Sequence, residues 1–191
     1  MRELVFATNN INKAEEVQLK VKNAFNILNL QQIGCTEDIA ETGLTLEENA
    51  SIKSRHVYEH YHKDCFGDDT GLEIEALNNE PGVFSARYSG ERDPIKNMDL
   101  VLEKMKGITN RTARFRTVIS LIINGEELLF EGIVQGKIRT ATSGTQGFGY
   151  DPIFEPEGYD ITFAEMGIEE KNSISHRGRA MEKLIAHLNS L

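Results

Sequence analysis

Acidic residues stand where the sequence could hold a hard cation. The stretch from residue 66 to residue 72 reads F-G-D-D-T-G-L, so Asp68 and Asp69 are adjacent after an apolar run. Carboxylate oxygens suit Mg²⁺, which takes one or two protein carboxylates and keeps several waters. Neighbouring side chains on an extended backbone point to opposite sides, so only one of the two need face a site. An acidic turn is the plain alternative, because D-D-T-G is also good turn chemistry.

Glu41 is the candidate for a second carboxylate. It lies in A-E-T-G-L-T-L-E-E-N-A, ahead of a helix that Thr45 and Glu48 would open as a capping box. A glycine turn before that helix could bring Glu41 beside Asp69. Taken by itself, Glu41 is better explained as a solvated loop residue.

The segment T-N-N-I-N-K, from Thr8 to Lys13, follows the first apolar run and precedes a helical pattern. Free backbone amides and the positive end of a helix dipole meet at such a junction, which favours an anion. Thr8 and Asn10 can donate hydrogen bonds, and Lys13 adds a charge. Neither glycine-rich phosphate-loop pattern occurs in the chain. A capped turn with a solvated lysine is the alternative.

Two later segments could hold the rest of a ligand. In S-G-T-Q-G-F-G-Y-D-P, residues 143–152, glycines allow close backbone approach beside Phe148 and Tyr150, and Asp151 could accept a hydrogen bond. In K-N-S-I-S-H-R, residues 171–177, the last two cations would oppose the dipole of a helix capped by Ser175, at ~0.3–1 kcal/mol each unless an anion offsets them. The alternative for residues 143–152 is a glycine-rich connection whose aromatic side chains pack in the core. The alternative for residues 171–177 is that Lys171 and Arg177 are solvated and that His176 is a hydrogen-bonded surface or core histidine.

The length, net charge and cysteine content of the chain limit the class of protein. A chain of 191 residues fits one domain, residues 1–191, with room for two lobes, and its net charge of −9 argues against a nucleic-acid polymer as partner. Cys35 and Cys65 are better explained as idle or buried thiols than as a disulfide or metal site. The short apolar start is no signal peptide and no run could span a bilayer, so we expect a cytoplasmic protein without a membrane partner.

The hydrophobic pattern predicts a mixed sheet flanked by helices. We expect a strand at residues 3–7, and a helix behind it on Ala14, Val17, Val21 and Ala24. A second helix is predicted at residues 45–61. A third should begin at Pro94 and turn an apolar face inward, made of Ile95, Met98, Leu102 and Met105. A fourth should follow Ser175, with an inward face made of Met181, Leu184, Ile185, Leu188 and Leu191. Residues 65–77 should form strand, turn, strand, and Asn124-Gly125 should close a hairpin. The fold class is α/β, in two lobes with a cleft between them.

Together these segments resemble the inosine triphosphate pyrophosphatase family. The carrying motifs span the whole chain in order: T-x-N-x-x-K at 8–13, E-T-G-x-T-x-x-E-N-A-x-x-K at 41–53, D-D-T-G-L at 68–72, P-G-V-x-S-A-R-Y at 81–88, G-F-G-Y-D-P at 147–152 and K-N-x-x-S-H-R at 171–177. The chain departs from the family at Asn9, where many members have glycine, and at Thr70, where bacterial members often have serine.

The resemblance implies Mg²⁺-dependent hydrolysis of ITP, dITP and XTP to nucleoside monophosphate and pyrophosphate by an elongated, two-lobed α/β homodimer. It implies that Glu41 and Asp69 bind the metal and that Asp69 accepts the proton. The positions it implies for substrate binding are Thr8, Asn9, Asn10, Ile11, Asn12, Lys13, Thr70, Phe148, Gly149, Tyr150, Asp151, Lys171, His176 and Arg177.

Base selection needs donors, because a 6-oxo purine presents an acceptor where adenine presents an amino group. A cationic donor such as Arg177 or Lys171 would favour the oxo form, and leaving it unpaired against adenine costs ~1–3 kcal/mol.

Two other functions stay open. One is a pyrophosphatase for modified pyrimidine nucleotides, as in Maf-type proteins, which lack K-N-x-x-S-H-R. The other is a nucleotide-binding module without catalysis, which would not need Glu41 together with Asp69.

Overall fold

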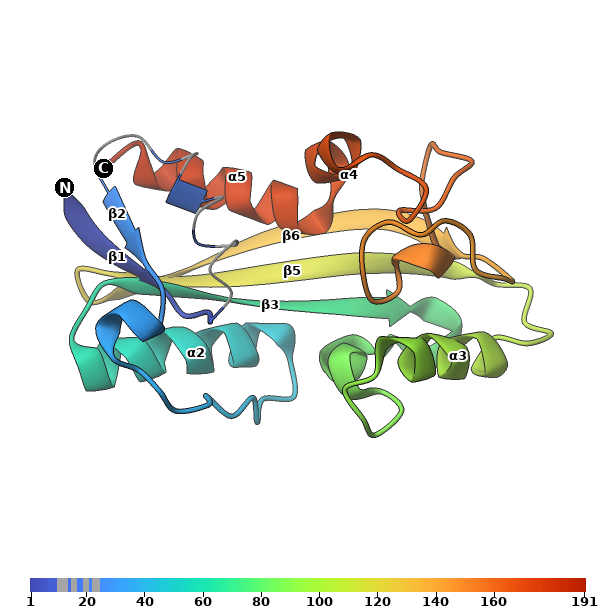
Figure 1. The fold of residues 1–191 in the computed structure, drawn as a ribbon, viewed down its shortest axis with the longest axis horizontal. Helices are drawn as coiled ribbons and strands as arrows, with labels where there is room; N and C mark the ends of the chain where they lie inside the picture. The colour runs from blue at the N-terminus through green and yellow to red at the C-terminus, as the bar shows by residue number, and fades with distance from the viewer. Residues whose placement is uncertain (10–13, 15–16, 19–20, 22–24) are drawn as a thin grey trace. The chain divides into compact units, whose positions relative to one another are not determined.

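A computed structural model describes residues 1–9, 14, 17–18, 21 and 25–191 (Figure 1). The strands are β1 (Arg2–Phe6), β2 (Phe25–Leu28), β3 (Cys65–Ile74), β4 (Glu80–Pro81), β5 (Thr112–Ile123), β6 (Glu126–Ile138) and β7 (Phe154–Pro156). The α-helices are α2 (Leu46–Tyr61), α3 (Pro94–Lys104), α4 (Ile168–Ile174) and α5 (His176–Leu188). Short 3-10 helices are η1 (Gln31–Ile33), η2 (Glu75–Leu77), η3 (Gly82–Arg87) and η4 (Asp151–Ile153).

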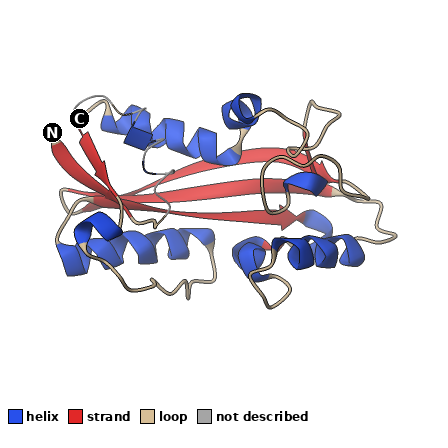
Figure 2. Cartoon of the chain, viewed as in Figure 1, coloured by secondary structure: helices blue, strands red, loops and turns tan. Residues whose placement is uncertain are grey.

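The strands form one mixed sheet in the order β2-β1-β3-β5-β6-β7, with β4 paired to β3 (Figure 2). β1 pairs in parallel with both β2 and β3, whereas β4 on β3 and β7 on β6 are antiparallel. The predicted class, a mixed α/β sheet with flanking helices, is therefore confirmed.

The chain divides into two compact units. Unit 1 comprises residues 1–69, 118–131 and 180–191, and unit 2 comprises residues 70–117 and 132–179. β3, β5, β6 and α5 each contribute residues to both units. The predicted single domain of two lobes and the predicted cleft both stay predictions.

In unit 1 the sheet is buried on both faces. Leu4 and Phe6 pack in a cluster with Leu184 and other residues of α5, whereas Val5 and Ala7 pack in another cluster that includes Val57 of α2. Alternate residues of a strand face opposite sides, so α2 and α5 cover opposite faces, as Figure 1 also shows. This double burial explains why residues 4–7, at the end of β1 and just after it, are continuously apolar.

Unit 2 has one core, built largely from aromatic and long aliphatic side chains. Phe115 of β5 packs with Phe154 and Phe163 in a triangle, with ring centroids 4.6 and 6.1 Å from its own and 5.2 Å from each other. Met98 and Met105 of α3 join the same cluster. This core supports the segments around residues 148–151 and 171–177 that the sequence singled out.

Capping and turn residues in the sequence correctly predicted where several helices and strands begin or end. Thr45 Oγ1 accepts a hydrogen bond from the Glu48 backbone N–H at 3.1 Å, and the Glu48 carboxylate accepts from the Leu44 N–H at 2.6 Å. Asp93 caps α3 ahead of Pro94, as predicted. Asn124 and Gly125 both have positive φ, 52° and 83°, which the predicted type I′ turn requires.

Three predictions were wrong in detail. The turn expected at G-D-D-T-G does not exist, because β3 runs unbroken from Cys65 to Ile74. Ile95 and Leu191 are 66% and 64% exposed instead of inward. Ile95 lies in the first turn of α3, whose inward face starts at Asn97, and Leu191 follows the end of α5. Ala14, Val17 and Val21 are buried as expected, and Ala24 lies outside the described residues.

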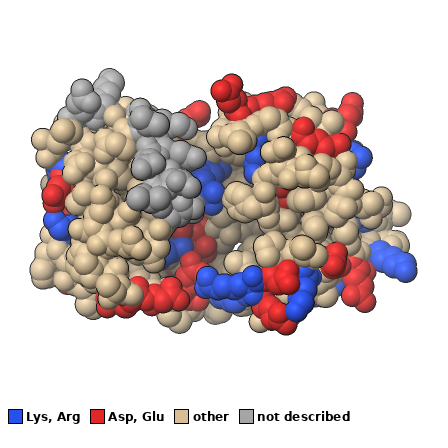
Figure 3. All heavy atoms as spheres, in the orientation of Figure 1, with Lys and Arg blue, Asp and Glu red and all other residues tan. Residues whose placement is uncertain are grey.

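Among the described residues, none of the helices has the length and apolar character needed to cross a lipid bilayer. On the face drawn in Figure 3, acidic and basic side chains lie interspersed.

Candidate active site

Asp69 stands on β3 where that strand passes very close to α2. A side chain on Gly67 would place its Cβ 2.8 Å from Lys53 Cβ and 2.9 Å from the Ala50 carbonyl oxygen, so only glycine allows this approach. Gly67 and Asp69 are two residues apart and face the same side of the sheet. The Asp69 carboxylate is therefore directed at α2.

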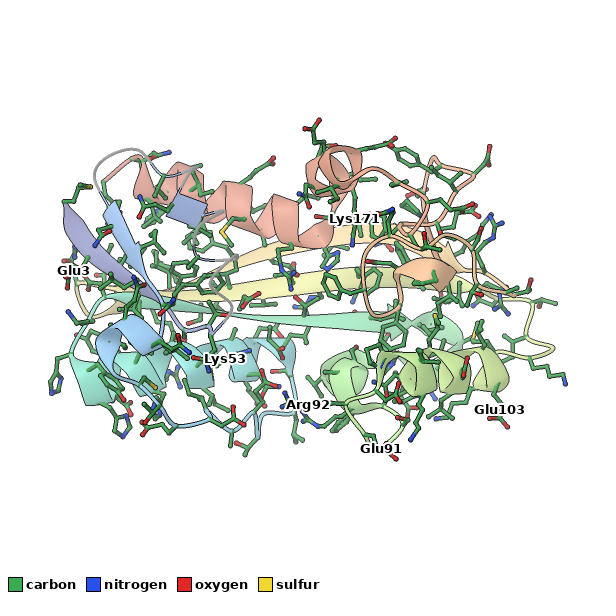
Figure 4. All side chains as sticks on the ribbon, in the orientation of Figure 1. Glu3, Lys53, Glu91, Arg92, Glu103 and Lys171 are labelled. Atoms are coloured by element: carbon green, nitrogen blue, oxygen red, sulfur yellow. The ribbon has the colours of Figure 1, made fainter. Side chains whose placement is uncertain are left out.

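Lys53 joins the two predicted carboxylates. Its Nζ lies 2.6 Å from Glu41 Oε1 and 3.8 Å from Asp69 Oδ1. Asn49, one helical turn earlier, donates its amide N–H to Asp69 Oδ2 at 3.1 Å and accepts from the Gly43 N–H at 2.8 Å. The exposed fractions are 14% for the Lys53 and Asp69 side chains and 25% for Glu41, so the group is shielded yet reachable. Figure 4 labels Lys53 on the side of α2 that faces the sheet.

Asp68 faces the other side. It is only 6% exposed, and its neighbour Phe66 packs in the core cluster with α5, whereas Cys65 packs in the cluster with α2. The expectation that the adjacent aspartates have different surroundings is met, because strand geometry alternates their directions. Asp69 is the one beside Glu41 and Lys53.

The first predicted phosphate-binding segment is described only in part. Thr8 follows β1, and its carbonyl oxygen accepts a hydrogen bond from the Leu30 N–H at 3.2 Å. Asn9 is exposed. Asn10, Ile11, Asn12 and Lys13 lie outside the described residues.

In unit 2, Asp151 gathers a second cluster. Its Oδ2 pairs with Lys171 Nζ and accepts the Phe148 N–H at 2.8 Å. Gly147 has φ +76°, and a Cβ there would stand 2.1 Å from the same Oδ2. The Asp151 side chain is 5% exposed. Asp151 therefore holds Lys171 and the Phe148 backbone in place, with Oδ2 already engaged.

Phe148 is exposed to solvent, and two cations lie over its ring. The side chain is 69% exposed, which is unusual for a large aromatic residue. Lys171 Nζ lies 5.0 Å and Arg177 Cζ 5.9 Å from the ring centroid. Lys171, labelled in Figure 4, comes from α4, a helix that the sequence did not indicate. An exposed aromatic face with hydrogen-bond donors beside it can accept a flat, acceptor-bearing ring.

Tyr150 and His176 belong to the core of unit 2. The Tyr150 hydroxyl donates to the Ser85 carbonyl oxygen at 2.7 Å, and burial raises the pKa of Tyr150. The His176 ring is 8% exposed and stacks on Phe115 at 4.7 Å between centroids. Both residues were predicted to bind substrate. Their surroundings match the alternative, aromatic and histidine side chains packed inside, and they support the neighbouring residues.

The remaining unit 2 positions have local partners. Ser175 caps α5 as predicted, since its Oγ accepts the Gly178 N–H at 3.1 Å. Thr70 Oγ1 lies 2.7 Å from Thr117 Oγ1 of β5. Gly149, with φ +62°, has open space where a Cβ would project, so its conformation is what requires glycine.

Comparison with known proteins decides the family. The model of the Ham1 family matches residues 4–187. The chain belongs to the Ham1 family. A dITP/XTP pyrophosphatase from Flavobacterium psychrophilum is 54% identical over 184 residues, covering 96% of this chain and 97% of that protein. This confirms the resemblance carried by the sequence motifs.

Solved Ham1 structures share the fold. A Staphylococcus aureus Ham1 protein superposes with a TM-score of 0.94 at 38% identity and 99% coverage of both chains. A HAM1 protein from Coxiella burnetii gives a TM-score of 0.95 at 38% identity, with both chains covered completely.

Sequence reasoning missed Asn49 and Lys53 in this Ham1 chain. Both lie inside the quoted motif E-T-G-x-T-x-x-E-N-A-x-x-K and inside the helix predicted at residues 45–61, but neither was assigned a role from the sequence. Their spacing of four residues was the available signal, because residues four apart share a helix face. An asparagine that is 1% exposed and a lysine that is 14% exposed need polar partners, and Asp69 supplies one to each.

Proposed function

We propose that this protein hydrolyses the non-standard purine nucleoside triphosphates ITP, dITP and XTP to the nucleoside monophosphate and pyrophosphate. The observation that carries the proposal is the arrangement of Glu41 and Asp69 around the single ammonium of Lys53. Two carboxylates and one cation leave a net negative group that suits a metal-assisted attack on a phosphoanhydride. The name of the Flavobacterium relative, dITP/XTP pyrophosphatase, supports the same substrates.

Asp69 is the proposed general base. In the reaction, a water oxygen bonds to the α-phosphorus while the bond from that phosphorus to the α–β bridging oxygen breaks. Pyrophosphate leaves with that oxygen, and the Asp69 carboxylate takes the water proton. The amide of Asn49 holds Oδ2 at 3.1 Å, so the carboxylate has a fixed direction. General base catalysis of this kind contributes roughly 10²–10⁴-fold.

Mg²⁺ fits the donor set of Glu41 and Asp69. Both offer hard carboxylate oxygens, and the two groups already share one cation in Lys53. One or two carboxylates with substrate phosphates and waters are a usual magnesium environment. When bound, Mg²⁺ neutralises phosphate charge and lowers the pKa of a coordinated water. Lys53 would then hold Glu41 in place through one oxygen while its charge offsets the negative phosphates.

Unit 2 supplies the proposed reader of the base. The exposed ring of Phe148 offers a stacking surface, and the cations of Lys171 and Arg177, which lie over this ring, offer hydrogen-bond donors. A 6-oxo purine presents an acceptor to such donors, whereas adenine presents an amino donor. The pair with Asp151 limits Lys171 to a narrow range of positions, because the salt bridge anchors its ammonium. Stacking on an aromatic residue is worth ~1–3 kcal/mol per base.

The setting is proposed with the activity. We expect a cytoplasmic homodimer that acts on free nucleotides, without a nucleic-acid polymer or membrane as partner. The net charge of −9 supports the choice of a small anion over a polyanion, because a few focused cations can hold a triphosphate but not a duplex.

The product assay tests the activity. ITP is incubated with the purified protein and Mg²⁺, and nucleotide and phosphate products are separated by chromatography. We expect IMP and pyrophosphate in equal amounts, with ATP and GTP turned over far more slowly. Orthophosphate and IDP as first products would overturn the pyrophosphohydrolase assignment.

The same assay with modified pyrimidine triphosphates decides between the proposal and a Maf-type activity. Faster turnover of the pyrimidines than of ITP would favour the latter. Tight ITP binding without any product would favour the nucleotide-binding module.

A further inference from the structure

A cluster in unit 1 combines three donor types that the proposed hydrolysis does not use. The Cys35 thiol, the Glu37 carboxylate and the His56 ring each offer one atom, and these atoms lie within 4.8 Å of one another. Cys35 and Glu37 belong to the segment after η1, and His56 lies on α2. We propose that this cluster is a zinc site.

The donor geometry is close to that of a zinc centre. His56 Nε2 lies 2.8 Å from Glu37 Oε1, and Cys35 Sγ points toward the Glu37 backbone oxygen, 4.0 Å away. With Zn–S of about 2.3 Å and Zn–N or Zn–O of about 2.0–2.2 Å, tetrahedral ligand atoms stand about 3.5 Å apart. Separations of up to 4.8 Å in the cluster must therefore shrink by about 1 Å, and the 2.8 Å between His56 Nε2 and Glu37 Oε1 must widen by about 0.6 Å, both of which small side-chain rotations can supply.

The donor chemistry selects zinc over magnesium. A thiolate and an imidazole are borderline-soft ligands that suit Zn²⁺, whereas Mg²⁺ prefers an all-oxygen set. Thiolate and carboxylate together would neutralise the divalent charge. Three protein ligands leave a fourth position for water. Cys35 is 1% exposed, but the His56 and Glu37 side chains are 22% and 53% exposed, so an ion can reach the cluster from solvent.

Neighbouring aromatic groups restrain the donors. The His60 ring stacks on His56 at 4.4 Å, and His60 Nδ1 lies 2.9 Å from the His56 backbone oxygen. The Tyr61 hydroxyl donates to Glu37 Oε1 at 3.4 Å. Partners of this kind orient metal ligands in established sites.

Zinc would also join two segments that carry proposed catalytic groups. Glu37 precedes Glu41 by four residues, and His56 follows Lys53 by three on the same helix. The Lys53–Glu41 pair already links these segments at 2.6 Å. The direct contact between Glu37 and His56 is a second link, and zinc bound by Cys35, Glu37 and His56 would replace it with metal–ligand bonds. A metal that binds only the folded protein stabilises it, so we expect zinc to raise the thermal midpoint of the protein.

Cobalt absorption provides a direct test. The full-length protein, reduced and freed of metal, is titrated with Co²⁺ in excess Mg²⁺, which saturates oxygen-only sites such as Glu41 with Asp69. We expect a near-ultraviolet sulfur-to-cobalt charge-transfer band that saturates at one equivalent and disappears when Zn²⁺ is added. Cys35→Ser should abolish the band. The matched control Cys65→Ser should keep it, because Cys65 Sγ contacts the Ser54 carbonyl oxygen at 2.9 Å and is not in the cluster.

A second variant guards against loss of folding in Cys35→Ser. His56→Gln changes a partly exposed residue, and its Zn²⁺ affinity is measured by competition with a chromophoric chelator. We expect the Zn²⁺ affinity of His56→Gln to be at least about 100-fold lower than that of the wild type. This exceeds the ~10–100-fold decrease that follows when a residue hydrogen-bonded to a metal ligand is removed. The absence of the band in folded wild-type protein would overturn the zinc site. So would its persistence in folded Cys35→Ser, its loss in folded Cys65→Ser, or an unchanged Zn²⁺ affinity in His56→Gln.

Discussion

The acid cluster of unit 1 and the aromatic cluster of unit 2 are positioned by different kinds of structure. Asp69 comes from a long strand, and its partners Asn49 and Lys53 come from consecutive turns of a sixteen-residue helix. Phe148 and Asp151 come from a glycine-rich connection and a 3-10 turn, and Lys171 from a helix of seven residues. The proposed base Asp69 and its partners therefore lie on a strand and a helix, whereas the exposed ring of Phe148 lies on a loop segment, the usual location for selectivity. Glu41, in the loop before α2, and Arg177, on α5, depart from this division.

The two clusters also differ in the sign of their charge. In the acid cluster one ammonium lies near two carboxylates, whereas the aromatic cluster contains one carboxylate, paired with Lys171, and a second cation, Arg177, over the Phe148 ring. Lys53 and Lys171 are almost equally shielded, at 14% and 15% exposed. Their roles therefore follow from their neighbours. A negative group suits a metal and a reacting water, and a positive one suits the acceptors of an oxo purine.

Changing Asp69 should give the largest effect and should affect turnover alone. We expect Asp69→Asn to lower kcat for ITP by roughly 10²–10⁴-fold, because the amide cannot accept the proton of the attacking water. The affinity for ITP should stay near the wild-type value, since the residues proposed to read the base lie in unit 2. Steady-state kinetics and equilibrium binding of ITP measure the two effects.

Asp99→Asn is the matched control, because Asp99 is exposed on α3, outside both clusters. A kcat for Asp69→Asn like that of Asp99→Asn would remove Asp69 as the base.

Changing Gly67 tests how strictly the regular elements position the acid cluster. In Gly67→Ala the new methyl would stand 2.8 Å from Lys53 Cβ, so α2 must move away from β3. We expect a loss of ~1–3 kcal/mol in the free energy of unfolding from overpacking, and a lower kcat as Lys53 and Asn49 shift from Asp69. Chemical denaturation and ITP kinetics measure these.

Gly167→Ala is the control for that change, because a Cβ there meets nothing within 4 Å. Equal stability of the two alanine variants would show that the close approach of α2 and β3 is not restrictive.

Changing Arg177 should act on selection. Without the guanidinium, the penalty against adenine falls, so we expect Arg177→Ala to reduce the ITP-to-ATP preference in kcat/KM by roughly 5–150-fold, equivalent to ~1–3 kcal/mol. Arg179→Ala is the control, since Arg179 lies on the same helix and donates to the Ile133 carbonyl oxygen at 2.7 Å. An equal preference in both variants would place base reading elsewhere.

The sequence predicted the fold best where local chemistry decides it. The capping residues Thr45 and Asp93 and the turn Asn124-Gly125 identified element ends, since each acts on its own backbone neighbours. The pattern failed at G-D-D-T-G because turn-forming residues there sit inside a strand paired on both sides. Tertiary pairing overrides local preference in such a place.

The candidate site was predictable only in its individual residues. The acids at 41 and 69 could be named from sequence, but their shared lysine could not, because it depends on the fit of Gly67 against α2. Likewise no histidine lies near Cys35 in sequence, yet the fold brings His56 beside it. Contacts between distant segments follow from packing, which no local pattern encodes.

The smallest effect should come from Glu155, a carboxylate with a framework role. Glu155 pairs with Lys137 at 2.7 Å and with Arg139, one acid between two cations, the reverse of the acid cluster. Burial alone would raise the pKa of Glu155, but hydrogen bonds from Lys137 and Arg139 outweigh it, so the pKa is lowered. A lowered pKa in the folded state stabilises the protein above the unfolded value of about 4.3. That contribution disappears as the pH falls through the folded pKa.

Glu155→Gln lacks this pH-dependent contribution. We expect its Tm to lie roughly 2–4 °C below wild type at pH 7 and the gap to narrow below about pH 4, with kcat for ITP unchanged. Thermal melts of both proteins from pH 7 to pH 3 measure the gap. A gap that is constant across this range would mean that packing, rather than charge, accounts for the loss. A fall in kcat would instead mean that the ion pairs of unit 2 reach the chemistry, and the separation between framework and catalytic carboxylates would no longer hold.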